Sequence, residues 1–191
     1  EDVEKDLNKG IYYSTLSANQ NNSIAQYYLG IIYCSEIKDL NKAIYYLNLS
    51  ANQNNSDAQC DLGKIYKQRK DLDKAIYYFT LSANQNNSIA QLNLGIIYYS
   101  EIKDLDKAIY YLNLSANQNN SNSQFMIYSQ YLLGKFYFFQ KNINKSIYYY
   151  TLAAKQNQIR SQTDLGWIYY DGLYVPKNVK KAIYYFKLAA D

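Results

Sequence analysis

Histidine is absent from the 191-residue sequence, and its absence removes several classes of chemistry. Ser-His-Asp and Cys-His nucleophile systems need an imidazole, and many zinc and haem sites use it as a ligand. The two cysteines, Cys34 and Cys60, cannot supply a four-sulfur metal site or a framework of several disulfides. We therefore expect a protein that is not an enzyme and that carries no metal and no cofactor.

Arginine is also scarce, because only Arg69 and Arg160 occur among the 20 basic residues. The net charge of +4 is therefore almost all lysine, whereas nucleic-acid sites favour the arginine fork. No apolar run approaches the roughly 20 residues that span a bilayer, and no signal peptide is visible. We expect neither a nucleic-acid nor a membrane partner, and a cytoplasmic location.

What the sequence has in excess is self-similarity, which also explains its 25 tyrosines. The pattern Leu-Gly-x-x-Tyr occurs five times, and its glycines step by 33, 32, 39 and 32 residues: Gly30, Gly63, Gly95, Gly134 and Gly166. The pattern Lys-(Ala/Gly/Ser)-Ile-Tyr-Tyr occurs six times, starting at Lys9, Lys42, Lys74, Lys107, Lys145 and Lys181. A period of this length indicates stacked helical hairpins.

Each unit predicts two antiparallel helices with their own start and stop signals. Ser-x-x-Gln predicts a capping box at the start of the first helix: Ser23/Gln26, Ser56/Gln59, Ser88/Gln91 and Ser121/Gln124. A side-chain oxygen three residues before the lysine predicts the cap of the second helix: Asp6, Asp39, Asp71, Asp104, Asn142 and Asn178. Asparagine, which tolerates the left-handed conformation, predicts the helix stop: Asn21, Asn54, Asn86, Asn119 and Asn157.

The repeated glycines and tyrosines predict how the helices pack. A glycine inside a helix costs about 0.5–1 kcal/mol relative to alanine, so five of them predict a close approach of the partner helix. Within each Ile-Tyr-Tyr pair, one tyrosine is expected to pack between repeats while the other keeps its hydroxyl in water.

The chain resembles the Sel-one-like repeat family, relatives of the tetratricopeptide repeats. The last unit carries the resemblance best, in Asp164–Ala182 (DLGWIYYDGLYVPKNVKKA) followed by Ala189-Ala190. Ala153-Ala154 keeps the same pair, whereas Asn54 and its equivalents replace the usual glycine at the helix stop. The first four units also have a shorter loop between their helices than the family norm. The resemblance covers essentially the whole chain and is specific for fold but not for function.

The resemblance implies an all-α fold, a right-handed superhelical α-solenoid of antiparallel helix pairs. We expect one domain, 1–191, with a leading helix at 3–18 and repeats at about 23–52, 56–84, 88–117, 121–155 and 159–191. The chain starts with Glu1 and within a repeat, so we expect a part of a longer protein. The fourth unit has six extra residues, which either lengthen its first helix or form a loop at 120–125; Ser123-Gln124 and Ser129-Gln130 are both possible alignments.

First helices of such solenoids usually line the concave face, and their outward stripe is the candidate partner-binding surface. Positions three before, one after and four after each glycine share this face. The stripe predicts aromatic anchors for a protein or peptide, with lysines that select acidic groups. Its members are Tyr27, Ile31, Lys64, Lys67, Leu92, Ile96, Tyr99, Tyr131, Lys135, Phe138, Trp167 and Tyr170. The alternative is that these side chains pack between neighbouring helices.

Some relatives of the family contain disulfides, but Cys34 and Cys60 are expected to stay apart. Their offset along parallel helices predicts a Cα separation of about 14 Å, twice the roughly 7 Å limit for a disulfide. The leading hypothesis is a non-enzymatic scaffold or adaptor that holds protein partners on its concave face. The alternatives are a hydrolase, as attributed to some disulfide-rich relatives, and a regulatory repeat segment of a larger polypeptide.

Overall fold

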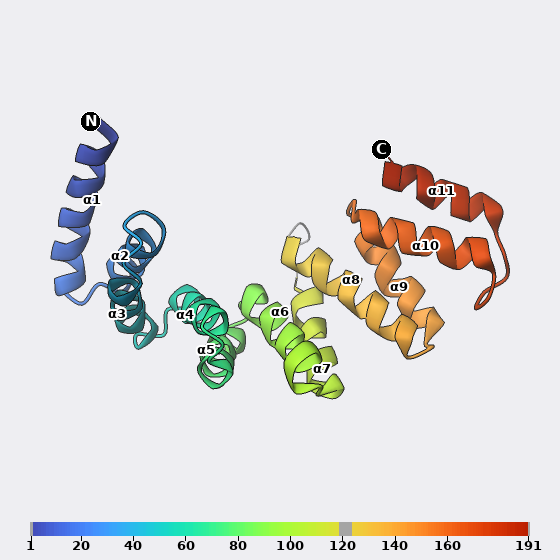
Figure 1. The fold of residues 1–191 in the computed structure, drawn as a ribbon, viewed down its shortest axis with the longest axis horizontal. Helices are drawn as coiled ribbons and strands as arrows, with labels where there is room; N and C mark the ends of the chain where they lie inside the picture. The colour runs from blue at the N-terminus through green and yellow to red at the C-terminus, as the bar shows by residue number, and fades with distance from the viewer. Residues whose placement is uncertain (1, 119–123, 191) are drawn as a thin grey trace. The chain divides into compact units, whose positions relative to one another are not determined.

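In the computed structural model, which describes residues 2–118 and 124–190 with side chains from Leu7 onward, every regular element is helical. The elements (Figure 1) are α1 (Asp2–Asn19), α2 (Ser23–Ser35), α3 (Leu40–Ala51), α4 (Ser56–Gln68), α5 (Leu72–Asn84), α6 (Ser88–Ile97), the π-helical η1 (Tyr98–Ile102), α7 (Leu105–Ala116), α8 (Gln124–Phe139), α9 (Ile143–Ala154), α10 (Ile159–Asp171) and α11 (Val179–Ala190). The expected all-helical solenoid of antiparallel helix pairs is confirmed. The chain forms two compact units, Glu1–Gln91 and Leu92–Asp191.

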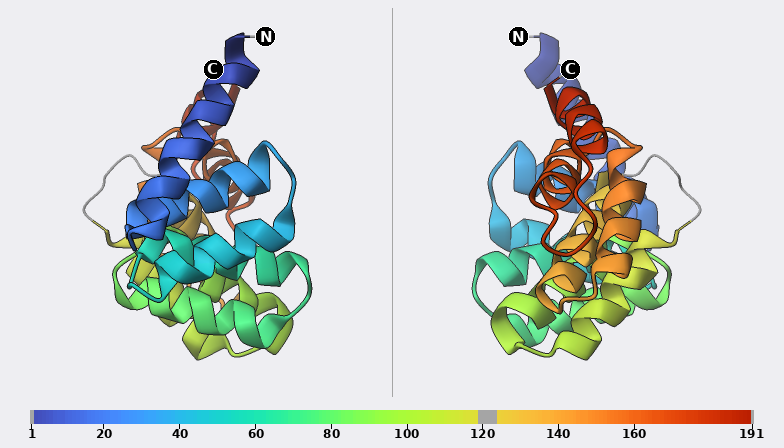
Figure 2. Two further views of the ribbon diagram at one scale, coloured as in Figure 1. Left: turned by 90° about the vertical axis from the view of Figure 1, so that its left-hand side faces the viewer. Right: turned by 90° about the vertical axis from the view of Figure 1, so that its right-hand side faces the viewer.

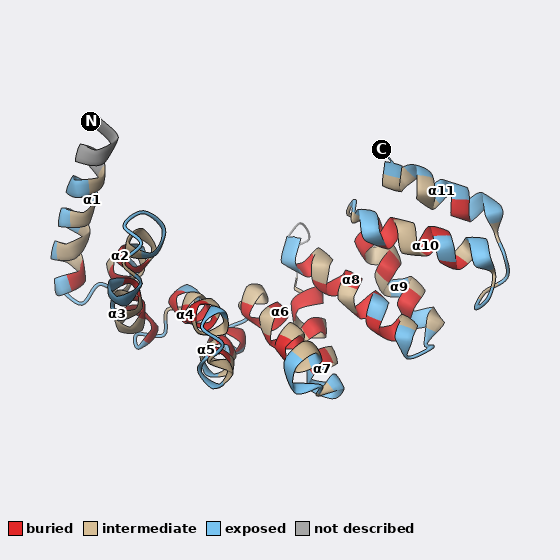
Figure 3. Ribbon diagram, viewed as in Figure 1, coloured by how far each residue is buried: buried red, intermediate tan, exposed pale blue. Residues whose placement is uncertain are grey.

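In the first unit each helix packs against the next one along the chain, from α1 to α5. The spacing of small and branched apolar residues turns one face of α3 and one of α4 towards each other. Leu47 and Ala51 of α3 meet Ala58, Leu62 and Ile65 of α4 in a core that excludes water. Figure 3 shows these buried positions as stripes along the helices, with exposed residues at the turns.

The second unit repeats the arrangement from η1 to α11. Its two cores lie between α6, α7 and α8 and between α8, α9 and α10, and include the following buried residues: Leu92, Leu112, Ala116, Leu133 and Tyr137 in the first, and Tyr131, Tyr150, Ala153, Ala154, Leu165 and Ile168 in the second. Helices α10 and α11 lie side by side and are joined by the longer loop 172–178 (Figures 1 and 2).

Side-chain oxygens cap the second helix of each pair as the sequence predicts. The backbone N–H of Lys42 donates to Asp39 Oδ1 at 3.1 Å, and the same contact recurs at Asp71, Asp104, Asn142 and Asn178. Asp6 is the exception, because α1 already begins at Asp2. A cap needs backbone amides that lack helical partners, and residues 2–5 place Asp6 inside the helix. The prediction for Asp6 is therefore wrong.

The predicted capping boxes of the first helices are also wrong, because the asparagine before each serine is the cap. Asn22 Oδ1 accepts from the backbone N–H groups of Ile24 and Ala25 at 3.0 and 3.1 Å. Asn55 and Asn87 cap α4 and α6 in the same way. The serine hydroxyl instead faces the partner helix, where Ser23 lies 3.1 Å from the hydroxyl of Ser50. Ser121 lies outside the described residues.

The glutamine of each expected capping box joins neighbouring helix pairs. Gln26 Nε2 donates to the carbonyl oxygen of Ala18 at 3.2 Å, near the C-terminus of the preceding helix. Gln26 Oε1 then accepts from Gln53 Nε2 at 2.7 Å. Equivalent donations to an alanine carbonyl come from Gln59, Gln91, Gln130 and Gln162. A buried side-chain amide therefore donates to a helix-end carbonyl at each of these junctions. Left without a donor, a buried carbonyl would cost about 1–3 kcal/mol.

This contact decides the alignment of the fourth unit. Gln130, not Gln124, is buried and donates to the carbonyl oxygen of Ala116 at 3.3 Å. Helix α8 starts six residues before Gln130, whereas α2 starts three residues before Gln26. The first helix of this unit is therefore longer by about one turn, and the rest of the insertion lies at 119–123, outside the described residues.

Left-handed residues end the helices at two places in each repeat. Asn21, Asn54, Asn86 and Asn157 have φ values of 60–63°, as the sequence predicts, and Asn119 lies outside the described residues. The turn between the two helices of a pair also uses this conformation, at Lys38, Lys70, Lys103 and Lys141. The last unit has Gly172 at this turn, with a φ of 69°. The lysines were not predicted, because their side chain gives no signal for a left-handed backbone.

The tyrosine pairs divide only in part as the sequence predicts, because five pairs have one packed and one exposed ring but the packed ring stacks within its own helix pair, and Tyr12 and Tyr13 of α1 are both exposed. Tyr46 stacks on Tyr33 of the partner helix with ring centroids 5.6 Å apart, and the Lys42 ammonium lies 5.1 Å from the Tyr33 ring. Tyr45, the other member of the pair, is 59% exposed. The same arrangement of lysine and stacked rings recurs at Tyr66/Tyr78, Tyr98/Tyr111, Tyr137/Tyr149 and Tyr169/Tyr185.

The glycines inside the first helices lie against the partner helix, which confirms the predicted close approach. A Cβ atom on Gly63 would lie 2.6 Å from a ring carbon of the fully buried Phe79. Leu47, Leu112, Tyr150 and Phe186 fill the same place over Gly30, Gly95, Gly134 and Gly166. A Cβ on Gly10 of α1 would meet nothing within 4 Å.

We predict that Gly63→Ala lowers the free energy of unfolding. The helix gains about 1 kcal/mol of propensity, but overpacking against Phe79 costs about 1–3 kcal/mol, so a net loss of up to about 2 kcal/mol is expected. Gly10→Ala is the control and should gain up to about 1 kcal/mol. Urea unfolding followed by circular dichroism measures both, and an equal gain in the two variants would contradict the close approach.

We also predict that Lys70→Gly stabilises the chain. A left-handed conformation costs a residue with a Cβ about 1–2 kcal/mol, and glycine removes this strain. The greater freedom of glycine in the unfolded chain offsets about 0.5–1 kcal/mol of the resulting stabilisation. Lys70→Ala, which keeps the strain, is the matched control. The same unfolding measurement should separate Gly from Ala by about 1 kcal/mol, and no separation would argue against a left-handed Lys70.

Candidate binding site

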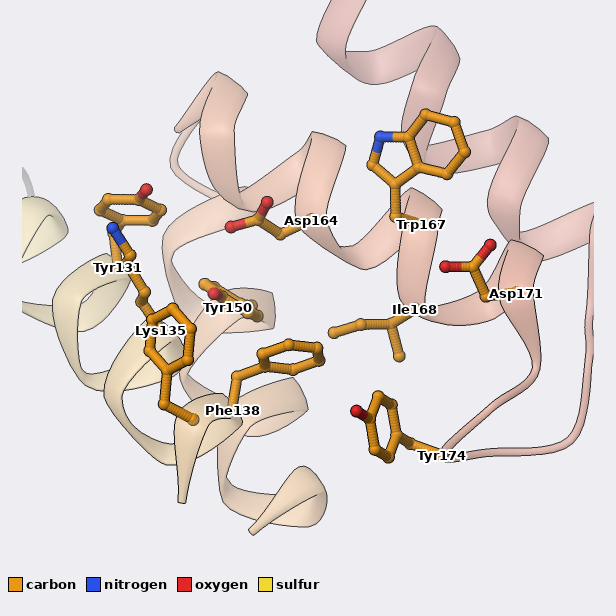
Figure 4. Close-up of a pocket in the computed structure, with 10 residues that line it drawn as sticks. Tyr131, Lys135, Phe138, Tyr150, Asp164, Trp167, Ile168, Asp171 and Tyr174 are labelled. Atoms are coloured by element: carbon orange, nitrogen blue, oxygen red, sulfur yellow. The ribbon is translucent and has the colours of Figure 1, made fainter. Parts of the chain in front are cut away.

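A recess of about 340 Å³ lies in the second unit between α8 and α10 (Figure 4), and we name it the α8–α10 recess. Helix α8 supplies one wall, α10 the other, α9 the floor, and the loop after α10 closes one end. Its lining is Tyr131, Lys135, Phe138, Phe139, Tyr150, Asp164, Trp167, Ile168, Asp171 and Tyr174.

Helical spacing explains why these side chains converge. Asp164, Trp167, Ile168 and Asp171 are three, four and seven residues apart and so share one face of α10. Tyr131, Lys135 and Phe138 do the same on α8. The floor is Tyr150, whose ring packs over Gly134, where the two helices approach closely.

The polar groups of the recess centre on Asp164, which is half-buried. The Tyr150 hydroxyl donates a hydrogen bond to this carboxylate. Burial raises the pKa of the Asp164 carboxyl, while Tyr150, Lys135 and Arg160 act in the opposite direction. Burial, with the nearby Asp164 charge, also raises the pKa of the Tyr150 hydroxyl well above its usual value. The neighbouring groups therefore offset only part of the cost of burying the Asp164 charge in this recess.

Aromatic rings form the rim. Trp167, the only tryptophan of the chain, is 52% exposed and contacts the rings of Tyr170 and Phe186 edge to face at 5.7 and 5.3 Å. Tyr174 meets Phe138 edge to face at 5.4 Å. Figure 4 shows Phe138 and Tyr174 near Ile168, with the Asp171 carboxylate on the same side and the Trp167 indole extending away from them. These contacts hold the rings in place before any ligand arrives.

A second recess of about 120 Å³ lies one repeat earlier in the same unit, and we name it the α6–α8 recess. Ile96 and Tyr99 form one wall, and Leu112 of α7 is the floor over Gly95. The α8 wall is Tyr128, Leu132, Lys135 and Phe136. Lys135 lines both recesses, and the remaining lining of the second recess is apolar or aromatic.

The structure brings seven members of the predicted stripe to these two recesses or their rim. Ile96 and Tyr99 line the α6–α8 recess, Tyr131, Phe138 and Trp167 the α8–α10 recess, and Lys135 both. Tyr170 lies beside Trp167 at the rim. Leu92, by contrast, is 5% exposed because it packs in the core with Leu112 and Leu133, so its predicted place on the outer stripe is wrong.

The stripe members of the first unit are occupied by contacts within the chain. The Tyr27 hydroxyl lies 3.3 Å from Asp61, and the Lys64 ammonium pairs with the same carboxylate at 2.8 Å. Burial, followed by the charge of Asp61, raises the pKa of Tyr27 to about 12. Ile31 and Lys67 are half-buried. Lys64 therefore already has an acidic partner.

Sequence reasoning missed Phe139 and four oxygen-bearing residues of the α8–α10 recess. Asp164 and Asp171 lie outside the three stripe positions, and Tyr174 lies in the loop after α10. Tyr150 belongs to a second helix, where the stripe assigned no binding role. The signal that could have found Tyr150 is its place in the repeat, because it faces Gly134 as Leu112 faces Gly95.

Comparison with known proteins places the chain among repeat proteins. The family model of the Sel1 repeat matches residues 1–22, 23–55, 56–87, 88–120, 127–158 and 159–191. Among solved structures, c5321, a protective antigen of uropathogenic Escherichia coli with an SLR fold, has a TM-score of 0.77 and 30% identity. The match covers 94% of this chain and 40% of that one, so the chain spans about two fifths of its length.

Two further structures share the fold. A Sel1 repeat protein from Oxalobacter formigenes has a TM-score of 0.75 and 26% identity, covering 97% of this chain and 80% of that one. The MamA protein has a TM-score of 0.63 and 22% identity, covering 87% and 89%. No curated protein matches the sequence significantly.

Within residues 2–118 and 124–190, no helix combines the length and apolar character that crossing a membrane requires. In the same residues, no three histidine, cysteine, aspartate or glutamate side chains gather where they could hold a metal ion. Cys34 is exposed, Cys60 is buried, and both are free thiols.

We predict that the two cysteines react at very different rates. Burial raises the pKa of the Cys60 thiol to about 12 and shields its sulfur, so it should resist a thiol reagent at neutral pH until the first unit opens. A chromogenic disulfide reagent should therefore titrate one thiol in the native chain and two in urea. Cys34→Ser should abolish the native reaction, and rapid reaction of two thiols would contradict the burial of Cys60.

Proposed function

The chain belongs to the Sel1 repeat family, and on that premise we propose that it is a non-enzymatic adaptor that holds a partner protein by a peptide segment. Sel1 repeat proteins are generally scaffolds for protein interactions. In this chain the segment binds along the first helices of the second unit, across the α8–α10 and α6–α8 recesses.

The α8–α10 recess is the observation that carries the proposal. Binding energy at protein interfaces concentrates in a few aromatic and basic side chains set in well-packed hollows. Here Trp167, Tyr174 and Phe138 line a hollow that contains the half-buried Asp164 carboxylate. A hollow with apolar walls and few convergent polar groups is the usual form of a ligand site.

The chemistry of the lining supports binding rather than hydrolysis. A hydrolase of the Ser or Cys type needs a nucleophile hydrogen-bonded to a base. The residues that line the two recesses include no serine, threonine or cysteine. Asp164 is instead hydrogen-bonded to Tyr150, a phenol whose raised pKa keeps it protonated.

A random-peptide display selection against the chain tests the proposal. We expect enriched peptides whose affinity, measured by calorimetry, falls about tenfold or more in Trp167→Ala, because exposed tryptophans in hollows are typical binding hot spots. The control is Tyr148→Ala. It removes a tyrosine of α9 that is 58% exposed and does not line the recess. Selection of no peptide, or equal binding by both variants, would reject a peptide site at these recesses.

A further inference from the structure

We propose that the α8–α10 recess binds the cationic side chain of a lysine or arginine in the partner segment. In the same extended segment, an apolar side chain about three residues away enters the α6–α8 recess. This inference rests on the proposed function and gives it a ligand chemistry. It also reverses the sequence-based expectation that the lysines of the stripe select acidic groups.

The first reason is the charge of the α8–α10 recess. Two carboxylates, Asp164 and Asp171, line it against the single ammonium of Lys135. Lys135 is exposed, and its ammonium lies 5.9 Å from the Phe139 ring at the edge of the site. The Asp164 carboxylate lies deeper and has lost part of its hydration, which the charges of Lys135 and Arg160 offset only in part, so the Coulomb attraction of an incoming cation would offset more of that loss.

The second reason is a comparison between two repeats. Asp61 of α4 and Asp164 of α10 both lie two residues before the helix glycine. Three residues after Asp61, Lys64 provides an ammonium at 2.8 Å. Three residues after Asp164 the chain has Trp167 instead, and the salt bridges within the described residues do not include Asp164. The last repeat therefore keeps the carboxylate, has a tryptophan where the second has the lysine that pairs with it, and leaves only the longer-range charges of Lys135 and Arg160 to act on Asp164.

The third reason is the aromatic wall. A cation over the face of a tryptophan or tyrosine ring is attracted by the ring quadrupole. Among the described residues this contact occurs six times, with lysine ammonium groups 4.8–5.1 Å from tyrosine ring centres, and one of them is Lys177 over Tyr170 at the rim of this recess. Trp167, Tyr131 and Tyr174 line the same recess as the Asp164 and Asp171 carboxylates, so the recess offers an external cation both aromatic rings and negative charge.

The neighbouring recess sets the register of the segment. The lining of the α6–α8 recess is apolar or aromatic apart from Lys135, and Leu112 forms its floor where Tyr150 forms that of the α8–α10 recess. The two recesses lie on either side of α8, so their centres are about one helix spacing, or 8–10 Å, apart. An extended chain advances about 3.3 Å per residue, which places the two side chains about three residues apart.

The test uses capped nonapeptides with one variable residue, Lys, Arg, Gln or Glu, and a leucine one, three or five residues away. Trp167 is the only tryptophan in the chain, so its fluorescence reports binding at the α8–α10 recess directly. We expect the Lys and Arg peptides with a three-residue spacing to bind about tenfold or more tightly than their Gln and Glu counterparts, because a hydrogen bond to a charged group typically contributes this much.

Matched variants locate the effect. Asp164→Asn preserves an acceptor for the Tyr150 hydroxyl and should reduce Lys-peptide binding to the level of the Gln peptide. Asp61→Asn changes the equivalent position of α4 and should leave that binding unchanged. Lys135→Glu should strengthen binding of the Lys peptide, because it removes the opposing charge.

The outcomes separate this inference from the proposed function. Equal or tighter binding of the Glu peptide, or an unchanged Lys-peptide affinity in Asp164→Asn, would overturn the basic-ligand inference while peptide binding itself stands. If the display selection enriches peptides without a lysine or arginine at a fixed distance from an apolar residue, the inference fails in the same way. If neither these peptides nor any selected peptide changes Trp167 fluorescence, the peptide site itself is rejected.

Discussion

The close approach of two helices at a glycine is the constraint on which the rest of the structure depends. Each first helix has one position where a Cβ would lie within 2.5–2.7 Å of a partner side chain. The chain accepts the poor helix propensity of glycine there because a large side chain of the second helix fills the space. Leu112 and Tyr150 are two such side chains, and their orientation over Gly95 and Gly134 follows from this contact.

The same constraint creates the candidate site. A side chain that packs over the glycine also forms the floor between two successive first helices, so one residue serves the core and the recess. Changing the floor from Leu112 to Tyr150 adds a hydroxyl without disturbing the packing on glycine, and that hydroxyl is bonded to Asp164. A repeat can therefore change the polarity of its recess at little structural cost.

The sequence predicts those parts of the fold whose cause is local. Asp39 and its equivalents cap the helix that follows, and Asn54 adopts the left-handed conformation, because each depends on the chain within a few residues. Prediction from the sequence fails where a residue contacts another that is distant along the chain. Gln26 looks like half of a local capping box but bonds to the previous helix, and Leu92 shares a helical face with Ile96 yet is covered by α7 and α8. Asp164 is a site residue only because Tyr150 lies beneath it.

Some positions of the repeat are nearly constant and others vary, and this explains why the two units differ in the charged groups that they leave available to a partner. Positions that join helix pairs are nearly identical in each copy, as Gln26, Gln59, Gln91, Gln130 and Gln162 show. Positions around the glycine vary, and their combination decides whether the carboxylate there is paired within the chain. With Tyr27, Asp61 and Lys64 the charges are neutralised within the first unit. With Tyr131, Asp164 and Trp167 the carboxylate has no lysine three residues away, and Tyr150, Lys135 and Arg160 offset its burial only in part, which is why we propose that a cation from outside completes the arrangement.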